Sequence, residues 1–176
     1  MEELKQIDPA TAVSFSGHRP DRLPGHGDPD TQDAQNLITA LREQIVGAVG
    51  RGKYIFLHGA MAGFDIFAAE QVIEMKKQHP QIQLVTVAPY RAQFFTTEDC
   101  WTREWIERAK KVFALHDIGV VVEHENRKGL YYKRNRVLVD HSSGLICYWD
   151  GKGGGTKYTV GYAFENKKPV INLYRG

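Results

Sequence analysis

The most chemically suggestive stretch of the sequence is a glycine-rich loop that runs from Gly151 to Gly155. It precedes Thr156, which is a good residue to cap the start of a helix. Bare backbone N–H groups in such a loop and the positive end of a helix dipole together attract phosphate or carboxylate. A tight turn before a capped helix is the alternative. The candidate ligand-binding residues here are Gly153, Gly154, Gly155, Thr156 and Thr159.

A second group of candidates, Gly17, His18 and Arg19, follows the first apolar segment of the chain. A guanidinium group in a glycine turn can form two parallel hydrogen bonds with a phosphate or carboxylate, which an ammonium group does less specifically. His18 could donate to the same ligand or stack on a base. The alternatives are a surface Arg19 that pairs with Asp21 and a histidine satisfied by backbone groups.

Gly59, Gly63 and Asp65 form a GxxxGxD pattern at the junction between a predicted strand and a predicted helix. Asp65 falls in the first turn of that helix, where capping alone explains an acidic residue. The functional alternative is a hydrogen bond to a ribose hydroxyl, which acidic residues form in dinucleotide-binding proteins. The pattern therefore predicts either a helix cap or a ribose contact.

The segment 131–136, YYKRNR, mixes aromatic and basic residues. Such a mixture suits single-stranded nucleic acid or a nucleotide, although an amphipathic helix with a solvated basic face has the same composition. Arg134 and Asn135 are the candidates for a ligand contact in this segment. Arg91, which follows another predicted strand, is a further candidate.

The composition argues against several classes of protein. The chain has 176 residues, of which 42% are hydrophobic and 25% charged, with a net charge of +2, so a folded protein without a strong field toward nucleic acid or membranes is expected. It lacks a CxxC motif, a signal-peptide pattern and an apolar run of about 18 residues, which favours a cytoplasmic protein that does not contact membranes. Zinc-binding HxxxH and HExxH, hydrolase GxSxG and Walker patterns are also absent, so no metal site, serine hydrolysis or P-loop ATP hydrolysis is predicted.

Apolar segments of strand length alternate with segments of helical periodicity along the chain. The predicted strands are 12–15, 53–58, 82–88, 118–122, 145–149 and 170–174. Residues 20–33 are predicted to form a loop, and the predicted helices are 34–50, 66–78, 98–111, 130–139 and 157–166. Trp101 and Trp105, four residues apart on one helix face, indicate a core or dimer contact. The alternation is typical of an α/β fold with three layers and a mainly parallel sheet, in one domain over residues 1–176.

The candidate residues share a position, because each group follows the C-terminal end of a predicted strand. In an open α/β sheet these ends line one crevice, in which ligands bind. Turn residues scattered at random would mark both ends of the strands equally. We therefore expect a ligand crevice at this edge of the sheet.

Four motifs together resemble a known family. They are SGHRP at 16–20, GAMAGFDIFAAE at 59–70, KRNRVLVDHSSGLI at 133–146 and GGTKYTVGYA at 154–163. In this order and spacing they resemble the YpsA-like family of the SLOG superfamily, which also holds the DprA/Smf recombination mediators and the LOG cytokinin-activating enzymes. The resemblance spans nearly the whole chain, and it implies a Rossmann-like fold that binds a nucleotide or nucleotide-derived ligand. Carried over residue by residue, it places around the ligand Gly17, Arg19, Gly59, Gly63, Arg134, Gly154, Gly155 and Thr156.

Enzymatic activity does not follow from the resemblance. LOG enzymes carry a PGGxGTxxE motif. Its glutamate takes part in splitting the N-glycosidic bond of a nucleoside monophosphate. Here no proline precedes the glycines, and Thr159 stands where the glutamate would be, although a threonine cannot act as a carboxylate. A LOG-like N-glycosidase would therefore need Asp65 or Glu70 as its catalytic carboxylate.

Two functions remain beside catalysis. Residues 156–163 and the RNR at 134–136 look DprA-like, which keeps single-stranded DNA binding as an interpretation, although the low net charge gives little counterion release. The preferred hypothesis is a cytoplasmic, homodimeric sensor or regulator with a small nucleotide ligand and no other known cofactor.

Overall fold

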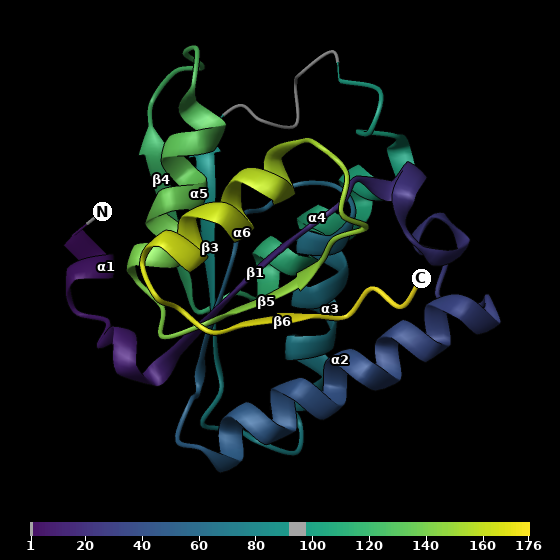
Figure 1. Cartoon of the computed structure of the whole chain (residues 1–176), viewed down its shortest axis with the longest axis horizontal. Helices are drawn as coiled ribbons and strands as arrows, with labels where there is room; N and C mark the ends of the chain where they lie inside the picture. The colour runs from purple at the N-terminus through teal and green to yellow at the C-terminus, as the bar shows by residue number, and fades with distance from the viewer. Residues whose placement is uncertain (1, 92–97) are drawn as a thin grey trace.

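The computed structural model describes residues 2–91 and 98–176, and its strands form one sheet (Figure 1). The strands are β1 (Ala12–Gly17), β2 (Ile55–His58), β3 (Gln83–Tyr90), β4 (Ile118–Glu123), β5 (Leu145–Tyr148) and β6 (Val170–Asn172). Their order is β4-β3-β2-β1-β5-β6, and every neighbouring pair is parallel. The chain builds outward from β1 through β2, β3 and β4 and then returns to the other side of β1 with β5. Such a reversal of strand order is where ligands bind in open α/β sheets.

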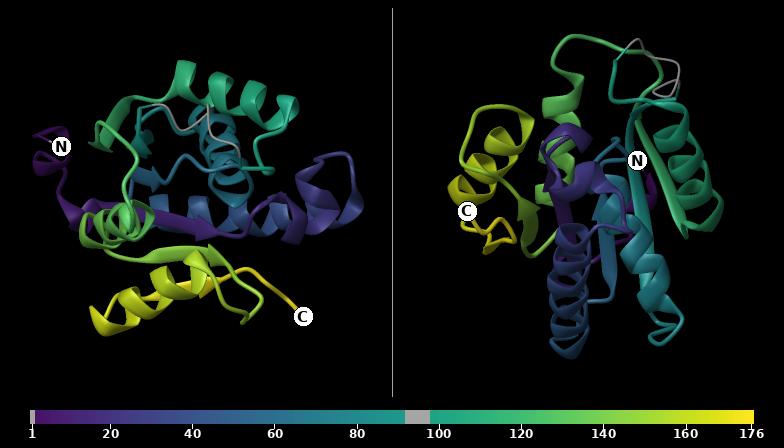
Figure 2. Two further views of the ribbon diagram at one scale, coloured as in Figure 1. Left: turned by 90° about the horizontal axis from the view of Figure 1, so that it is seen from above. Right: turned by 90° about the vertical axis from the view of Figure 1, so that its right-hand side faces the viewer.

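Helices cover both faces of the sheet, as the two views in Figure 2 show. The core on one face joins side chains of the sheet to those of α2 (Gln32–Gly50), α3 (Phe64–Lys76) and α4 (Arg103–Leu115). The cores on the other face join the sheet to α1 (Glu2–Lys5), α5 (Leu130–Asp140) and α6 (Gly155–Glu165). The α/β, Rossmann-like three-layer architecture expected from the sequence is therefore confirmed, with a sheet that is parallel throughout.

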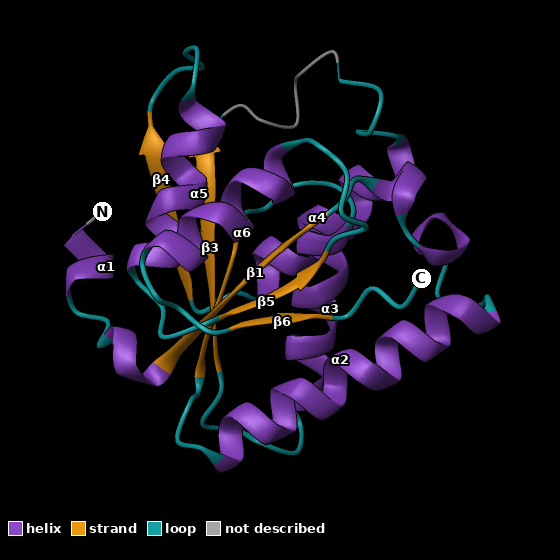
Figure 3. Ribbon diagram, in the orientation of Figure 1, coloured by secondary structure: helices purple, strands orange, loops and turns teal. Residues whose placement is uncertain are grey.

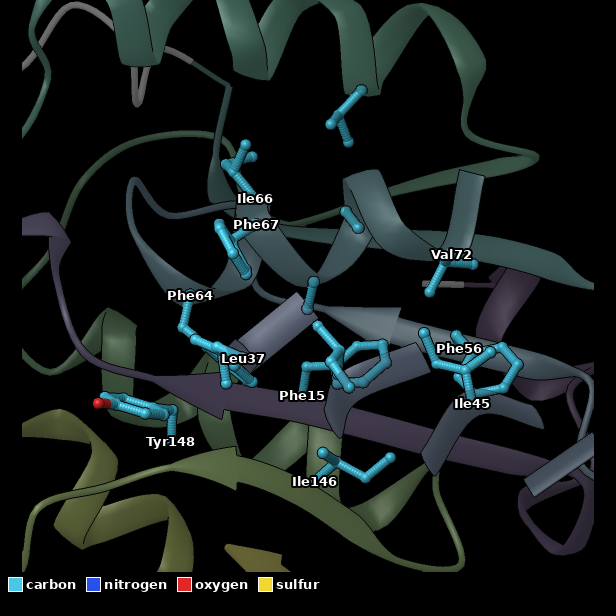
Figure 4. Packing of buried hydrophobic residues seen from close by; sticks show 14 of the residues in the cluster. Phe15, Leu37, Ile45, Phe56, Phe64, Ile66, Phe67, Val72, Ile146 and Tyr148 are labelled. Carbon is cyan, nitrogen blue, oxygen red and sulfur yellow. The ribbon is translucent and has the colours of Figure 1, made fainter. Parts of the chain in front are cut away.

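Aromatic side chains of the central strands form the middle of the larger core (Figure 4). The rings of Phe15 on β1 and Phe56 on β2 are stacked with their centroids 5.9 Å apart. Phe64, at the start of α3, stacks on Tyr148 at the end of β5 with a centroid distance of 6.1 Å. Because both faces of the central strands are buried, their sequences are almost continuously apolar rather than alternating.

Figure 3 shows the helices, strands and loops of the structure. Several of their boundaries differ from the sequence prediction. The predicted loop 20–33 contains two 3-10 helices, η2 (Pro20–Arg22) and η3 (Pro24–Gly27), and α2 begins at Gln32 because Thr31 Oγ1 accepts a hydrogen bond from Ala34 N at 3.4 Å. Helix α4 begins at Arg103 rather than at 98, since Thr102 Oγ1 caps it by accepting from Trp105 N. Helix α1 and the 3-10 helix η1 (Pro9–Thr11) were not predicted.

Trp101 and Trp105 are 8% and 4% exposed and belong to the core beside α2, α3 and α4. Their core interpretation is confirmed, and the expected homodimer stays a prediction. Within residues 2–91 and 98–176 no helix is long and apolar enough to cross a bilayer. The same residues contain no cluster of three or more His, Cys, Asp or Glu side chains that could hold a metal ion.

Candidate functional site

A pocket of about 270 Å³ lies at the C-terminal end of β1, bounded by the segment before α3, by α5 and by the glycine loop before α6. It brings together candidates that come from four separate stretches of sequence. The candidate residues that line it are Gly17, His18, Arg19, Asp65, Arg134, Asn135, Gly154, Gly155 and Thr156. A crevice is therefore present at this edge of the sheet. The candidates that are not among the described residues lining it are Gly59, Gly63, Arg91, Gly153 and Thr159.

Arg134 on α5 forms the floor of the pocket and is 4% exposed. Its Nη1 donates to the carbonyl oxygen of Gly59 and lies 3.3 Å from Asp65 Oδ2, while its Nε donates to Asn135 Oδ1 at 2.9 Å. Asp65 also accepts from Met61 N at 3.4 Å. Burial raises the pKa of Asp65, and the Arg134 guanidinium opposes that shift. Asp65 therefore serves mainly to pair with Arg134 and to hold the turn before α3.

Three of the predicted glycines are explained by contacts within the protein. A Cβ on Gly59 would collide with Arg134 Nη1, and one on Gly17 would collide with the side chain of Phe64. Gly63 has φ +103°, and a Cβ there would collide with the carbonyl oxygen of His18. Because these residues lack a side chain, β1, α3 and α5 can approach one another closely beside the pocket.

The glycine loop before α6 differs from those glycines because it is open. Among the described residues, a Cβ on Gly153 or Gly154 would have no neighbour within 4 Å, and one on Gly155 would meet only Asn135 Nδ2 at 3.8 Å. Gly154, with φ +129°, is the N-cap of α6 and supplies no side chain to its first N–H groups. The predicted cap at Thr156 is therefore wrong by two residues, and the helix N-terminus faces the pocket with bare N–H groups.

Thr159, by contrast, is fully buried and donates from Oγ1 to the carbonyl oxygen of Gly155 at 3.0 Å. This bond within α6 uses the hydroxyl group. Thr159 is not among the described residues that line the pocket.

An ion-pair cluster fixes the position of the glycine loop, and we call it the Asp150 latch (Asp150, Arg22 and His18). Arg22 donates to both carboxylate oxygens of Asp150 and, at 3.4 Å, to the carbonyl oxygen of Gly153. His18 Nε2 lies 2.9 Å from Asp150 Oδ1. The Arg22 guanidinium holds the pKa of Asp150 far below its usual range, whereas burial lowers the pKa of His18. The latch thus combines a carboxylate, an arginine and an uncharged histidine at neutral pH.

Arg19 is the least constrained of the arginines that line the pocket. Its Nη2 lies 3.3 Å from Glu98 Oε2, and both side chains are 39% exposed. Glu98 also accepts a hydrogen bond from Tyr131 Oη at 2.7 Å. The pairing of Arg19 with Asp21, considered from the sequence, is therefore replaced by a pairing with Glu98. Because exposed ion pairs contribute only about 0–1 kcal/mol, Arg19 can exchange this partner for a ligand at little cost.

Two further candidates lie elsewhere. Glu70 on α3 accepts two hydrogen bonds from Arg108 on α4, at 2.7 and 2.6 Å, and is not among the described pocket-lining residues. Arg91 is exposed just beyond β3, and the residues that follow it lie outside the described part of the chain. The structure thus brings neither side chain to the pocket.

The sequence reasoning did not select all of the residues that line the pocket. Those it did not propose as ligand contacts are Ser16, Asp21, Arg22, Met61 and Tyr131. Arg22 and Tyr131 carried a usable signal, since each lies within three residues of a candidate arginine in a segment already singled out. Met61 is the middle residue of the GAMAG turn and carried none.

The family model YpsA, described as "YspA SLOG family", matches residues 13–171. The UPF0398 protein YpsA of Bacillus subtilis is 23% identical over 159 residues, which cover 89% of this chain and 86% of that protein. UPF0398 protein BH1768 of Halalkalibacterium halodurans is 30% identical over 139 residues, covering 73% of this chain and 68% of that one.

The fold is also similar to solved structures of DNA processing protein A. The Helicobacter pylori protein, described in terms of its single-stranded DNA binding mode, has a TM-score of 0.63 at 18% identity, over 100% of this chain and 70% of its own. DprA of Streptococcus pneumoniae has a TM-score of 0.60 at 14% identity, over 98% of this chain and 52% of its own. At these identities the likeness concerns the fold alone. The match over residues 13–171 establishes the family, and the chain belongs to the YpsA family of SLOG proteins.

Proposed function

We propose that the chain binds a nucleotide or nucleotide-derived ligand in this pocket and acts as a sensor or regulator. One observation carries the proposal: the open glycine loop at the start of α6 and the half-exposed guanidinium of Arg19 line the same pocket. Bare N–H groups, the positive end of a helix of 11 residues and an arginine together make a site for a phosphate group.

The environment of the loop strengthens this proposal. The Asp150 latch holds the loop in place through the protein's own contacts. A preformed loop loses less conformational entropy when a ligand binds, which favours affinity. The phosphate of the ligand would replace Glu98 as the partner of Arg19, and the nucleoside would extend over Tyr131 and Asn135.

The positions of the carboxylates Asp65 and Glu70 favour binding without turnover over catalysis. Asp65 forms an ion pair with Arg134, and Glu70 accepts two hydrogen bonds from Arg108. An N-glycosidase needs a carboxylate that faces the sugar of its substrate. We therefore expect no release of free base from nucleoside monophosphates.

The test is a thermal-shift screen with nucleoside mono-, di- and triphosphates, NAD, ADP-ribose and cyclic dinucleotides, followed by calorimetry on any hit. A ligand at one hundred times its Kd stabilises a protein by about 2.7 kcal/mol, which raises the Tm of a domain of this size by roughly 5–10 °C. Arg19→Ala should weaken a hit at least about tenfold, since it removes a charge-assisted hydrogen bond.

Gly155→Asp separates binding from folding in this test. A carboxylate in the first turn of α6 interacts favourably with the positive end of the helix dipole. The Tm of the free variant should therefore equal or exceed that of the free wild type. The same carboxylate repels a phosphate on the glycine loop, so binding should be lost. Arg51→Ala, an exposed arginine that follows α2, is the matched control for Arg19→Ala. A hit that survives both Arg19→Ala and Gly155→Asp would refute the proposed site.

Binding of single-stranded DNA is the second candidate, and the likeness to the fold of DprA favours it. Its signature would be an affinity for oligonucleotides that falls steeply with salt and is weakened by Arg136→Ala, a change at an exposed basic residue of α5. A flat nucleotide screen together with this signature would replace the first proposal by the second.

A further inference from the structure

A second cavity is a groove on the surface of α5 and α6. We call it the tyrosine groove, and its volume is about 400 Å³. The residues on which the argument rests are Tyr132, Gly154, Lys157, Tyr158, Gly161 and Tyr162. Except for Gly154, these residues are not among those that line the pocket described above.

The tyrosine rings of the groove hold one another in place. The rings of Tyr132 and Tyr158 lie 4.6 Å apart at an interplanar angle of 61°, and the rings of Tyr158 and Tyr162 lie 6.4 Å apart and nearly parallel, at 4°. Tyr162 Oη donates to Asp140 Oδ1 at 2.9 Å, which anchors the end of the row. Tyr132 is nevertheless 48% exposed. Fixed but exposed aromatic rings are surfaces on which a planar group can stack.

Gly161 keeps the groove open between these rings. It lies inside α6, and a Cβ there would have no neighbour within 4 Å in residues 2–91 and 98–176. No contact with this part of the chain therefore requires glycine at this position, although glycine is among the poorest residues for a helix interior. Its effect on the surface is to leave space beside Tyr158 that a side chain would fill.

The groove and the pocket beside Arg19 share one lining residue. Gly154 lines both, so a ligand whose phosphate lies on the glycine loop can extend in either direction. Lys157 adds a positive charge on the groove side of the loop. The nucleotide pocket alone, at about 270 Å³, is smaller than most small-molecule sites, which span roughly 300–1,000 Å³, whereas the two cavities together fall within that range.

We propose that the ligand is a dinucleotide, with two nucleosides joined through pyrophosphate across the glycine loop. One nucleoside occupies the pocket beside Arg19, and the base of the other stacks on Tyr132 and Tyr158 in the tyrosine groove. This inference rests on the proposed function, since the glycine loop must hold the phosphates. It adds the class of ligand and the residues that select it.

The experiment compares ADP with diadenosine diphosphate by isothermal titration calorimetry on the full chain. Stacking of the second base should make diadenosine diphosphate bind about tenfold more tightly than ADP. Tyr132→Ala and Gly161→Leu should each remove this advantage while leaving the Kd of ADP unchanged. Phe164→Ala, a change at an aromatic residue of α6 that is 62% exposed and does not line the groove, is the control and should keep it.

The outcomes separate the two proposals. Equal affinity of ADP and diadenosine diphosphate, or an advantage that survives both groove variants, would overturn the inference and leave the proposed function standing. Failure of both probes to bind would overturn the inference, and the nucleotide screen would then decide the proposed function separately. A phosphodiester-linked deoxyadenosine dinucleotide that binds more tightly than diadenosine diphosphate would overturn the pyrophosphate assignment in favour of a nucleic-acid strand.

Discussion

Arg134 Nη1 lies 3.3 Å from Asp65 Oδ2, and both side chains are almost completely buried, at 5% and 9% exposed. The pair joins α5 to the first turn of α3 beneath the candidate pocket. A guanidinium group stays protonated in proteins, so its burial is tolerated only with partners that satisfy its donors. Gly59, Asn135 and Asp65 provide those partners.

Arg134→Met should therefore destabilise the protein strongly. Removal of the guanidinium leaves the Asp65 carboxylate buried without its charged partner, and the free energy of unfolding should fall by about 3–5 kcal/mol. Urea denaturation measures this change. Arg136→Ala, at an exposed position of the same helix, should stay within about 0.5 kcal/mol of the wild type. The double variant Asp65→Asn/Arg134→Met should recover part of the loss, and equal losses in both variants would refute the pairing argument.

The two kinds of glycine should respond differently to alanine. Gly59→Ala places a methyl group against Arg134 and should reduce the free energy of unfolding by about 1–3 kcal/mol. Gly153→Ala places the same methyl group in open space and should change it by less than about 0.5 kcal/mol. Thermal and urea unfolding of the two variants in parallel would decide the matter. A stable Gly59→Ala protein would mean that the glycine has another purpose than close packing.

The Asp150 latch predicts a local change in acidity. Arg22→Ala removes the hydrogen bonds that are the main cause of the lowered pKa of Asp150, so that pKa should rise toward its ordinary value. Carbon-detected NMR titration of the aspartate side chains measures this pKa directly. Arg175→Ala, a change at an exposed arginine near the C-terminus, should leave the Asp150 signal unchanged. An Asp150 pKa that stays low in Arg22→Ala would assign the shift to the surrounding backbone instead.

His58 predicts a loss of stability in acid. The side chain is fully buried, with Nε2 2.8 Å from Thr86 Oγ1 and Nδ1 accepting from Ala60 N at 3.3 Å, and burial lowers its pKa from 6.5 to about 3. Between those two pH values the unfolded chain binds one more proton at this residue than the folded chain does. The contribution of His58 to stability is therefore complete above pH 6.5 and falls as the pH drops toward 3, by up to about 1.4 kcal/mol per pH unit.

Urea denaturation at a series of pH values tests this contribution. His58→Gln lacks the titrating group. Its free energy of unfolding should therefore depend less steeply on pH between 4 and 6 than that of the wild type, and the difference in slope should correspond to about one bound proton. His124→Gln, a change at an exposed histidine, should keep the wild-type slope. The same slope in all three proteins would show that His58 is not buried in its neutral form.

Glu70 should matter for stability and not for the ligand. Its two hydrogen bonds with Arg108, at 2.7 and 2.6 Å, join α3 to α4, and Glu70→Ala should cost about 1–2 kcal/mol. The Kd of a nucleotide found in the screen should not change. Glu74→Ala, whose carboxylate forms an exposed pair with Lys77, is the control on the same helix and should cost less than about 0.5 kcal/mol. A loss of binding in Glu70→Ala would reopen the case for a catalytic carboxylate.

The sequence predicted those parts of the fold that depend on local patterns. The apolar run at 145–149 and the helical spacing at 34–50 correspond to β5 and α2, because burial on both faces or on one stripe leaves a direct trace in residue type. The two short 3-10 helices after β1 were not predicted. Their positions depend on contacts such as that of Arg22 with Asp150, 128 residues away, which no local pattern records.

The site shows the same division. The C-terminal strand ends correctly indicated where Arg19, Asp65 and the glycine loop would meet, since strand order alone brings them together. Sequence could not separate the glycines that admit a neighbouring side chain, such as Gly59, from those that leave open space, such as Gly154. Both residues are glycines, and only their neighbours in the folded chain distinguish them.

The pairing of β1 with β5 has a consequence for the protein during its synthesis. Ser14 on β1 pairs with Leu145 on β5. The backbone groups on this edge of β1 therefore have no strand to pair with until most of the chain has left the ribosome. At about 5–20 residues per second this delay is on the order of ten seconds. During that time a central, apolar strand is open to pairing with other chains. The strand order that creates the pocket therefore also leaves one edge of β1 unpaired until β5, in the last fifth of the chain, has been made.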